Sequence, residues 1–395
     1  MADHAAISNE PTTTALRRRI VAVFAMHGVV LATMNMRMPD LQLIAGLNDA
    51  HLGLVLMGAP VGALAIFPFA PRLIETLGTR RLILLSYLLM PLAAAGVGTL
   101  THPLTMFALL AAVGSSSSLG NIAINVEADR VEALTGARLM NRCHGSWSIV
   151  FFAASMLAGL IRGAGIDPTL HLWGLVPAYW LATLVVVAPM AECPPRPVSG
   201  APTRRIAWPT PAILSLFAFG LGAFLLEGAS RVWATIYMRD VFHVSALMES
   251  LAVPALVLTM AAGRLLSDRW IEYFGPVRYA RWSLALGLLG LGLVVAASGP
   301  WLAIGGFAVA GLGVGVAYPL MISGAARLGD RPASQNVASI ALVFQLVTLL
   351  APMLTGAAAE AFGVRAAFAL QLGGKGRRAD VRCRRAECIP PGAAV

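Results

Sequence analysis

The sequence predicts an all-α polytopic membrane protein: two six-helix bundles in a pseudo-two-fold parallel repeat, with a truncated or aberrant twelfth helix. Of its 395 residues, 58% are hydrophobic and only 12% are charged, and the mean hydropathy is +0.75. That is too little polar surface for a soluble domain of this length. Apolar runs of the ~20 residues that cross a bilayer recur along the chain. A segment of the first half also reappears in the second, which indicates an internal duplication.

The first bundle is expected over residues 17–190, after a polar segment, 1–16, that we expect to be disordered. Three arginines, Arg17 to Arg19, precede the first apolar run, as in a signal peptide. That run continues to Met38 without a small-residue cleavage site, so it predicts a membrane helix. The six predicted spans of this bundle lie near 20–37, 51–69, 82–100, 104–126, 145–161 and 172–190.

A linker and a second bundle follow. Residues 191–210 are rich in proline and arginine, which cannot be buried in lipid, and they predict a cytoplasmic linker. Tyr318-Pro319 is expected to bend the fourth helix of the second bundle. That bundle, residues 211–372, is predicted to have spans at 213–238, 247–266, 279–298, 301–323 and 338–359, with a twelfth helix that starts near Ala366.

The orientation follows from the loop arginines, because cytoplasmic loops of membrane proteins carry an excess of Lys and Arg. With a cytoplasmic N-terminus, 18 arginines fall on the inner side. We therefore predict a multi-pass protein of the inner membrane, in contact with lipid, with its N-terminus inside. The net charge of +10 then reflects membrane insertion and not nucleic-acid binding. The outer side holds four arginines: Arg37, Arg162, Arg239 and Arg365.

The internal repeat relates residues 70–82 to residues 267–279 at an offset of 197 without a gap. Both segments follow the second helix of their half. The offset implies a two-fold axis along the membrane normal. The matched pairs are Arg72 with Arg269, Glu75 with Glu272, Gly78 with Gly275, and Arg81 with Arg278.

The tail, residues 373–395, departs from this pattern. The offset places a twelfth helix near 368–387, but six basic residues follow Gly373 and cannot occupy hydrocarbon. A change of reading frame near Gly373 is the explanation we favour, because the composition changes abruptly there. A basic tail that touches anionic lipid is the alternative.

Two ionisable residues lie at membrane depth in the predicted span 213–238. Glu227 and Arg231 are four apart and share a helix face. A charged side chain at the bilayer centre costs roughly 2.5–3.5 kcal/mol, so this face must meet protein or water. The functional interpretation is a site that handles a proton or a substrate. The structural alternative is a self-satisfied pair that fixes helix packing.

Other polar residues at membrane depth admit the same two interpretations. His27 is able to titrate near neutral pH or to pack with a hydrogen bond. Asn35 lies about two turns further on the same face. Three further residues could bind hydroxyl or amide groups of a substrate, or could form hydrogen bonds between helices: Asn121, Asn125 and Gln345.

The loops resemble the signature loop of the major facilitator superfamily, roughly G-x-x-x-D-R-x-G-R-R. The second-half copy carries Gly263, Asp268 and Arg269, then Glu272, Gly275 and Arg278. The resemblance implies that Asp268 and the arginines clamp helix ends between the halves. The first-half copy has Pro71 in place of the acidic residue. A clamp there is expected to use Arg72 or Glu75, beside Gly78 and Arg81.

The chain is also similar to the fucose-permease-like branch of that superfamily, which contains proton-linked sugar carriers. The similarity rests on Arg37 within Met-Arg-Met-Pro-Asp, on Asn125, on the run 144–148, and on Trp233 and Tyr237 after Glu227. It implies substrate or proton roles for Arg37, Asn125, Glu227, Trp233 and Tyr237, whereas His144 is expected to form local hydrogen bonds. Where many members have an acidic residue before the tryptophan, this chain has Val232.

These observations predict a secondary active transporter that moves a small polar solute by alternating access, with proton coupling, as a monomer. No cofactor, metal or catalytic group is expected. A polytopic membrane enzyme would need a nucleophile or a metal set near an interface, and a channel or receptor would need a polar pore ring or a sensor domain. The sequence shows neither, but both classes stay open.

Overall fold

Helices account for the regular structure throughout the described part of the chain, in which no strand occurs. The computed structural model describes residues 10–137, 139–194, 208–315, 317–326, 328 and 333–373. The predicted disordered segment and linker therefore lie partly outside the described residues, and the basic tail lies almost wholly outside them. The predicted all-α fold class is confirmed.

The first group of helices begins with α1, which exceeds the predicted span 20–37 at both ends. The second predicted span is divided into several short helices, because Pro60, Pro68 and Pro71 lack the N–H that a continuous helix needs. The elements are α1 (Glu10–Ile44), α2 (Asp49–Leu56), α3 (Gly58–Ile66), a 3₁₀ turn (Phe67–Phe69), α4 (Ala70–Leu77), α5 (Thr79–Thr99), α6 (Pro103–Thr135), α7 (Met140–Gly163) and α8 (Pro168–Val186).

The helices of the second group follow one another in the same order as those of the first. The predicted span 301–323 is divided near Gly315, and Pro319 lies in the first turn of the next helix, where its missing N–H is tolerated. The elements are α9 (Pro211–Phe242), α10 (Ala246–Glu249), α11 (Ala252–Phe274), α12 (Pro276–Ala296), α13 (Pro300–Val314), α14 (Ala317–Ala326), α15 (Ala333–Phe362) and α16 (Val364–Gly373).

The helix boundaries reproduce the internal repeat. The starts of α2 and α10, of α5 and α12, and of α6 and α13 are each 197 residues apart. The two loop glycines, Gly78 and Gly275, both have φ 79°, with ψ 160° and 154°. This positive φ is cheap only for glycine, and it lets the chain turn directly from one helix into the next. The predicted parallel repeat is thus present in the backbone.

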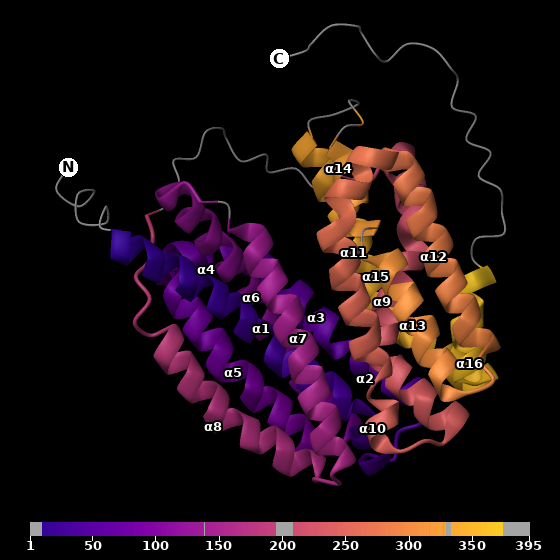
Figure 1. Cartoon of the computed structure of the whole chain (residues 1–395). Helices are drawn as coiled ribbons and strands as arrows, with labels where there is room; N and C mark the ends of the chain where they lie inside the picture. Colours follow the sequence, from indigo (N-terminus) through magenta and orange to yellow (C-terminus); the bar gives the residue numbers. More distant parts are fainter. Residues whose placement is uncertain are drawn as a thin grey trace, which may run out of the picture.

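Figure 1 shows the two groups side by side, α1 to α8 in indigo and magenta and α9 to α16 in orange and yellow. The groups meet at one end, near α2 and α10, and diverge toward the other, where α4 and α14 lie. We call these the closed end and the splayed end. Nine helices of the described part are long and apolar enough to cross a membrane, or ten if the bent α9 counts as one span.

The described part of the twelfth helix is α16, whose 10 residues fall short of the ~20 that span a bilayer. Phe368 is fully buried, with its ring centre 5.5 Å from that of Tyr237 and 5.6 Å from that of Phe307. The start of this helix is therefore anchored in the second group, close to the predicted start at Ala366.

Candidate functional site

Three charged side chains gather midway along the second group. Glu227 lies at the middle of α9 and Arg231 follows one turn later. Nη2 of Arg231 donates a hydrogen bond of 2.6 Å to Oε1 of Glu227, and Nη2 of Arg264 on α11 lies 3.7 Å from the same oxygen. We call these three residues the central cluster. It holds two guanidinium groups for one carboxylate.

The position of Arg264 is fixed by the break between α13 and α14. Pro319 has no N–H, so the carbonyl of Gly315, four residues earlier, has no α-helical donor. Nε of Arg264 donates to that carbonyl oxygen at 2.7 Å. The guanidinium is thereby held against the break with one Nη toward Glu227. From the sequence alone, Arg264 is only one of the 18 arginines predicted on the inner side.

The central cluster also touches the first group of helices. The guanidinium carbon of Arg231 lies 5.8 Å from the ring centre of Trp147 and 5.5 Å from that of Phe151, both on α7. These distances are those of cation–π contacts. We call Trp147 and Phe151 the aromatic wall. Gly28 of α1 lets α7 pack close to α1 at this wall, since a Cβ there would lie 3.2 Å from the carbonyl oxygen of Trp147. Arg231 therefore faces the interface between the two groups.

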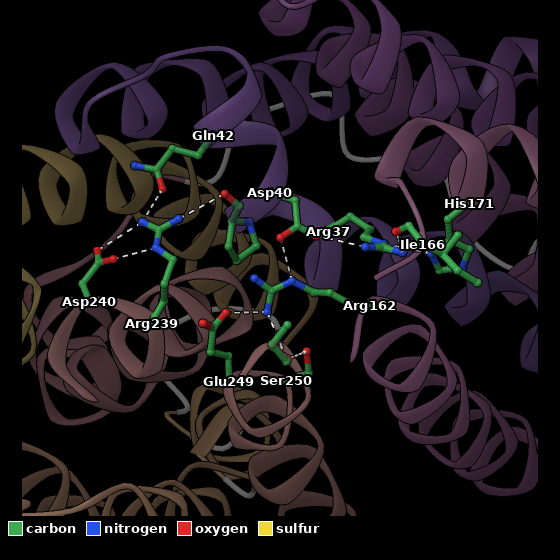
Figure 2. A network of polar contacts seen from close by, with 12 residues as sticks. Arg37, Asp40, Gln42, Arg162, Ile166, His171, Arg239, Asp240, Glu249 and Ser250 are labelled. Atoms are coloured by element: carbon green, nitrogen blue, oxygen red, sulfur yellow. Dashed lines mark hydrogen bonds and ion pairs between the residues drawn. The ribbon is translucent and has the colours of Figure 1, made fainter. Parts of the chain in front are cut away.

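A second set of charges joins the groups at the closed end (Figure 2). Arg162 of α7 donates to Asp40 of α1 at 2.7 Å and pairs with Glu249 of α10 at 2.5 Å. Arg37 pairs with the other oxygen of Asp40 at 3.0 Å and donates to Nδ1 of His171 at 2.9 Å. The four charges balance: two guanidinium groups meet two carboxylates. We call Arg37, Asp40, Arg162 and Glu249 the closed-end network.

Further hydrogen bonds cross the same end. Arg239 of α9 donates to the carbonyl oxygen of Pro39 at 3.0 Å and to Oε1 of Gln42 at 2.9 Å (Figure 2). Glu360 of α15 accepts from the backbone N–H of Asp49 at 3.0 Å. Helices α1 and α2 of the first group are thus tied to α9 and α15 of the second.

Small residues let the helices of the two groups approach closely at the closed end. A Cβ on Gly53 of α2 would lie 2.6 Å from the carbonyl oxygen of Pro352 on α15. A Cβ on Gly356 would lie 2.8 Å from the Cα of Gly53. On the other side, a Cβ on Gly159 of α7 would lie 2.7 Å from the Cβ of Ser250. Such contacts are typical of membrane helix interfaces.

As far as both partners are described, no hydrogen bond or ion pair joins the remaining predicted site residues of the first group to the central cluster. His27 is buried, with Nε2 3.3 Å from the hydroxyl oxygen of Ser117 and its ring stacked 5.8 Å from that of Tyr87. Asn35 is half-buried. Nδ2 of Asn125 donates to the backbone oxygen of Asn121 at 2.8 Å. Arg37 belongs to the closed-end network.

Of the remaining predicted site residues of the second group, Trp233 and Tyr237 lie in its interior and Gln345 lies on α15. Trp233 is fully buried, and the hydroxyl of Tyr237 donates to the carbonyl oxygen of Val294 at 2.5 Å. Gln345 is half-buried on α15. Their assignment to the substrate or proton site stays a prediction, as it does for the residues of the first group.

The predicted gating loops are positioned at the splayed end. In the second copy, Tyr279 donates to the carbonyl oxygen of Gly263 at 3.4 Å, and the side chain of Asp268 lies outside the described residues. Most loop side chains are exposed at this end: Arg72, Glu75, Arg81, Arg269, Glu272 and Arg278. Neither Arg72 nor Glu75 forms an ion pair with a described residue, so the structure gives no support for the clamp expected there.

A different group fixes the first loop. The hydroxyl of Thr79, next to Gly78, donates to Glu127 at 2.6 Å, and the backbone N–H of Cys193 donates to the other oxygen at 2.8 Å. Arg130 lies 3.7 Å from Glu127. Burial and the adjacent Glu127 carboxylate raise the pKa of the Cys193 thiol to about 12. The sequence missed Glu127, whose Glu-x-x-Arg spacing at a helix end was the available signal.

Comparison with known proteins shows similarity along most of the chain, although no protein-family model matches it. The chain is 24% identical over 351 residues to an uncharacterized MFS-type transporter of Yersinia pestis, covering 87% of this chain and 89% of that one. It is 27% identical over 357 residues to the uncharacterized transporter y4wD of Sinorhizobium fredii, covering 89% and 93%. It is 27% identical over 349 residues to the membrane protein MosC of Rhizobium meliloti, covering 86% and 83%.

Solved transporters share the fold. A mutant of the nucleoside transporter NupG aligns with a TM-score of 0.72 and 13% identity, covering 92% of this chain and 96% of that one. A bacterial homologue of the human lysosomal transporter Spinster, inward-facing and unoccupied, aligns with a TM-score of 0.71 and 15% identity, covering 93% and 95%.

The fold and these similarities define a multi-pass membrane transporter. More particularly, it shares the two-domain fold of the solved transporters and is similar over most of its length to a transporter described as MFS-type. The relatives and structural neighbours are transporters and a membrane protein, in agreement with the prediction that the chain is not an enzyme. The fucose-permease-like branch stays a prediction.

Proposed function

We propose that the protein is a proton-coupled secondary transporter that carries a small polar solute across the inner membrane by alternating access, as a monomer. The two transport domains would be residues 17–190 and 211–372. The observation that carries the proposal is the one-sided closure between them. Wherever both partners are described, every hydrogen bond and ion pair between the two groups lies at the closed end.

A transporter of this kind needs a contact surface that can separate while a charged site stays reachable from one side. Polar pairs and glycine contacts can exchange partners or water when the halves rock. With the N-terminus in the cytoplasm, α1 starts at the splayed end and finishes at the closed end. The structure then corresponds to a state open to the cytoplasm and closed to the outside.

The central cluster is the proposed coupling site. Glu227 lies at membrane depth, where an ionisable side chain marks a transport pathway by default. Its two arginine neighbours hold it as a carboxylate, and arrival of a proton would release both. The cluster touches α7 of the other domain through Arg231, so a change in its charge acts directly on the domain interface.

The test is Glu227→Gln in proteoliposomes. A thermal-shift screen of small molecules first identifies a solute that binds, because a ligand that binds only the folded state raises its apparent stability. Glu227→Gln is expected to abolish accumulation driven by a proton gradient, since glutamine cannot take up a proton. Exchange of labelled solute across the same membrane, which needs no net proton movement, is expected to persist and serves as the internal control. Accumulation that survives in Glu227→Gln would place proton coupling at another residue, with His27 the next candidate.

A further inference from the structure

Within the described residues, no second carboxylate balances the charge of the central cluster. Arg231 and Arg264 carry two positive charges and Glu227 carries one negative charge, which leaves an excess of +1. The other titratable group that acts on the cluster is His144 of α7, which interacts electrostatically with Arg264. No other described residue forms an ion pair with the three. An excess of positive charge at membrane depth attracts an anion to the cluster.

The two arginines of the cluster are also partly exposed. The side chain of Arg231 is 26% exposed and that of Arg264 is 34% exposed, whereas Glu227 is 16% exposed. Oε1 of Glu227 is 2.6 Å from Arg231 but 3.7 Å from Arg264. The longer distance leaves Arg264 without a close carboxylate partner among the described residues. Guanidinium groups bind carboxylates through paired hydrogen bonds.

We propose that the central cluster binds the carboxylate of a small organic anion, and that one proton binds to Glu227 with it. This inference rests on the proposed function and names its substrate class. The ligand carboxylate takes over the arginines from Glu227. The aromatic wall of Trp147 and Phe151 lies beside Arg231 and provides an apolar surface for the body of the ligand.

The net charge of the site explains why a proton and an anion bind together. The empty cluster carries +1 with Glu227 ionised. Protonation of Glu227 raises this charge to +2, and one bound carboxylate returns it to +1. The loaded and empty sites therefore carry the same charge, so the domain interface rearranges without adding a charge at membrane depth. A neutral solute would leave a protonated site at +2, which is the costlier arrangement.

The test compares carboxylates with their neutral counterparts on the purified full-length protein. The probes are lactate and lactamide, benzoate and benzamide, and glucuronate and glucose, each pair at equal concentration. At least one carboxylate is expected to raise the melting temperature while its counterpart does not. In a weakly buffered solution with a pH indicator, that carboxylate is expected to be bound with uptake of one proton, and Glu227→Gln is expected to remove the proton uptake.

Two variants of one residue separate charge from structure. Arg264→Gln is expected to weaken binding of the stabilising carboxylate by at least about tenfold, because it loses a charge-assisted hydrogen bond. Arg264→Lys keeps the charge and is expected to retain most of the binding. If Arg264→Gln does not fold, the pair Arg231→Gln and Arg231→Lys provides the same comparison, because only the glutamine removes the charge.

The outcomes distinguish this inference from the proposed function. Stabilisation by the neutral probes, or by none of the carboxylates, overturns the anion assignment and leaves the transport proposal to the Glu227→Gln experiment in proteoliposomes. A carboxylate that binds with one proton supports the inference. If the same carboxylate is never carried across the proteoliposome membrane, the anion site stands and the proposed function fails.

Discussion

The closed-end network and the central cluster are built from the same two kinds of side chain and differ in charge balance. In the closed-end network, two guanidinium groups meet two carboxylates. In the central cluster, two guanidinium groups meet one. A balanced set is complete by itself and holds two surfaces together. An unbalanced set keeps an excess positive charge that attracts an anion.

Burial follows the same division. The side chains of Arg162 and Glu249 are 5% and 7% exposed, and a buried ion pair persists only when both partners are present. The arginines of the central cluster are several times more exposed, so a ligand can reach them. The comparison assigns different tasks to the two clusters: the first holds one end closed, and the second is the proposed binding site.

The largest effect is expected from Arg162→Gln, which unbalances the closed-end network. Asp40 keeps Arg37, but Glu249 loses its partner and becomes an uncompensated buried charge. Breaking a buried pair in this way costs roughly 3–5 kcal/mol. We expect a clear fall in melting temperature and a shift toward states in which the closed end is open. Thermal unfolding measures the first effect. Maleimide labelling of Ser250→Cys, in a background without the native cysteines, measures the second.

The double variant Arg162→Gln/Glu249→Gln is the matched control. It removes both partners and leaves no unpaired charge, so it should recover a large part of the lost stability. A double variant that is less stable than Arg162→Gln would show that packing, and not charge balance, dominates at this end.

A smaller effect is expected from Gly356→Ala, which tests the packing component of the same closure. The new Cβ would lie 2.4 Å from the carbonyl oxygen of Asp49 and 2.8 Å from the Cα of Gly53. Overpacking of this kind costs about 1–3 kcal/mol, here only in the closed arrangement. Faster maleimide labelling of Ser250→Cys is therefore expected. The control is Gly292→Ala on α12, where a Cβ has no neighbour within 4 Å. Equal labelling rates in both variants would show that glycine packing does not contribute to closure at this end.

The sequence predicted the fold well because lipid restricts what a spanning segment can be. Every backbone polar group must be satisfied inside the segment, so long apolar runs become helices. The repeat was also readable, since Gly78 and Gly275 share a backbone conformation that favours glycine. The breaks near Gly315 and in the second span were harder to predict. They depend on whether a residue far away in the sequence donates a hydrogen bond to the backbone carbonyl left free at the break, as Arg264 does for Gly315.

The candidate site was only partly readable. Glu227 and Arg231 are four residues apart, so one helix reveals the pair. Arg162, Glu249 and Arg264 come from other helices, and their partners are 84 to 122 residues away or on another span. From the sequence, Arg162 and Arg264 were indistinguishable from arginines that set membrane orientation. Trp233 and Tyr237 adjoin Arg231 in sequence, but a helix rotates them toward the core of the second group.

The smallest effect on stability is expected from Arg264→Gln, and its small size is what the comparison requires. This variant removes a guanidinium, as Arg162→Gln does, but it leaves Glu227 paired with Arg231 at 2.6 Å. The cluster then becomes neutral. The lost hydrogen bond to Gly315 costs about 1 kcal/mol, and relief of repulsion between the two guanidinium groups offsets part of it. We therefore expect a melting temperature close to that of the unmodified protein, measured in the same detergent and without added anion. A fall as large as that of Arg162→Gln would mean that Arg264 holds the fold as firmly as the closed-end network does. The distinction between a complete cluster and one that awaits a ligand would then be wrong.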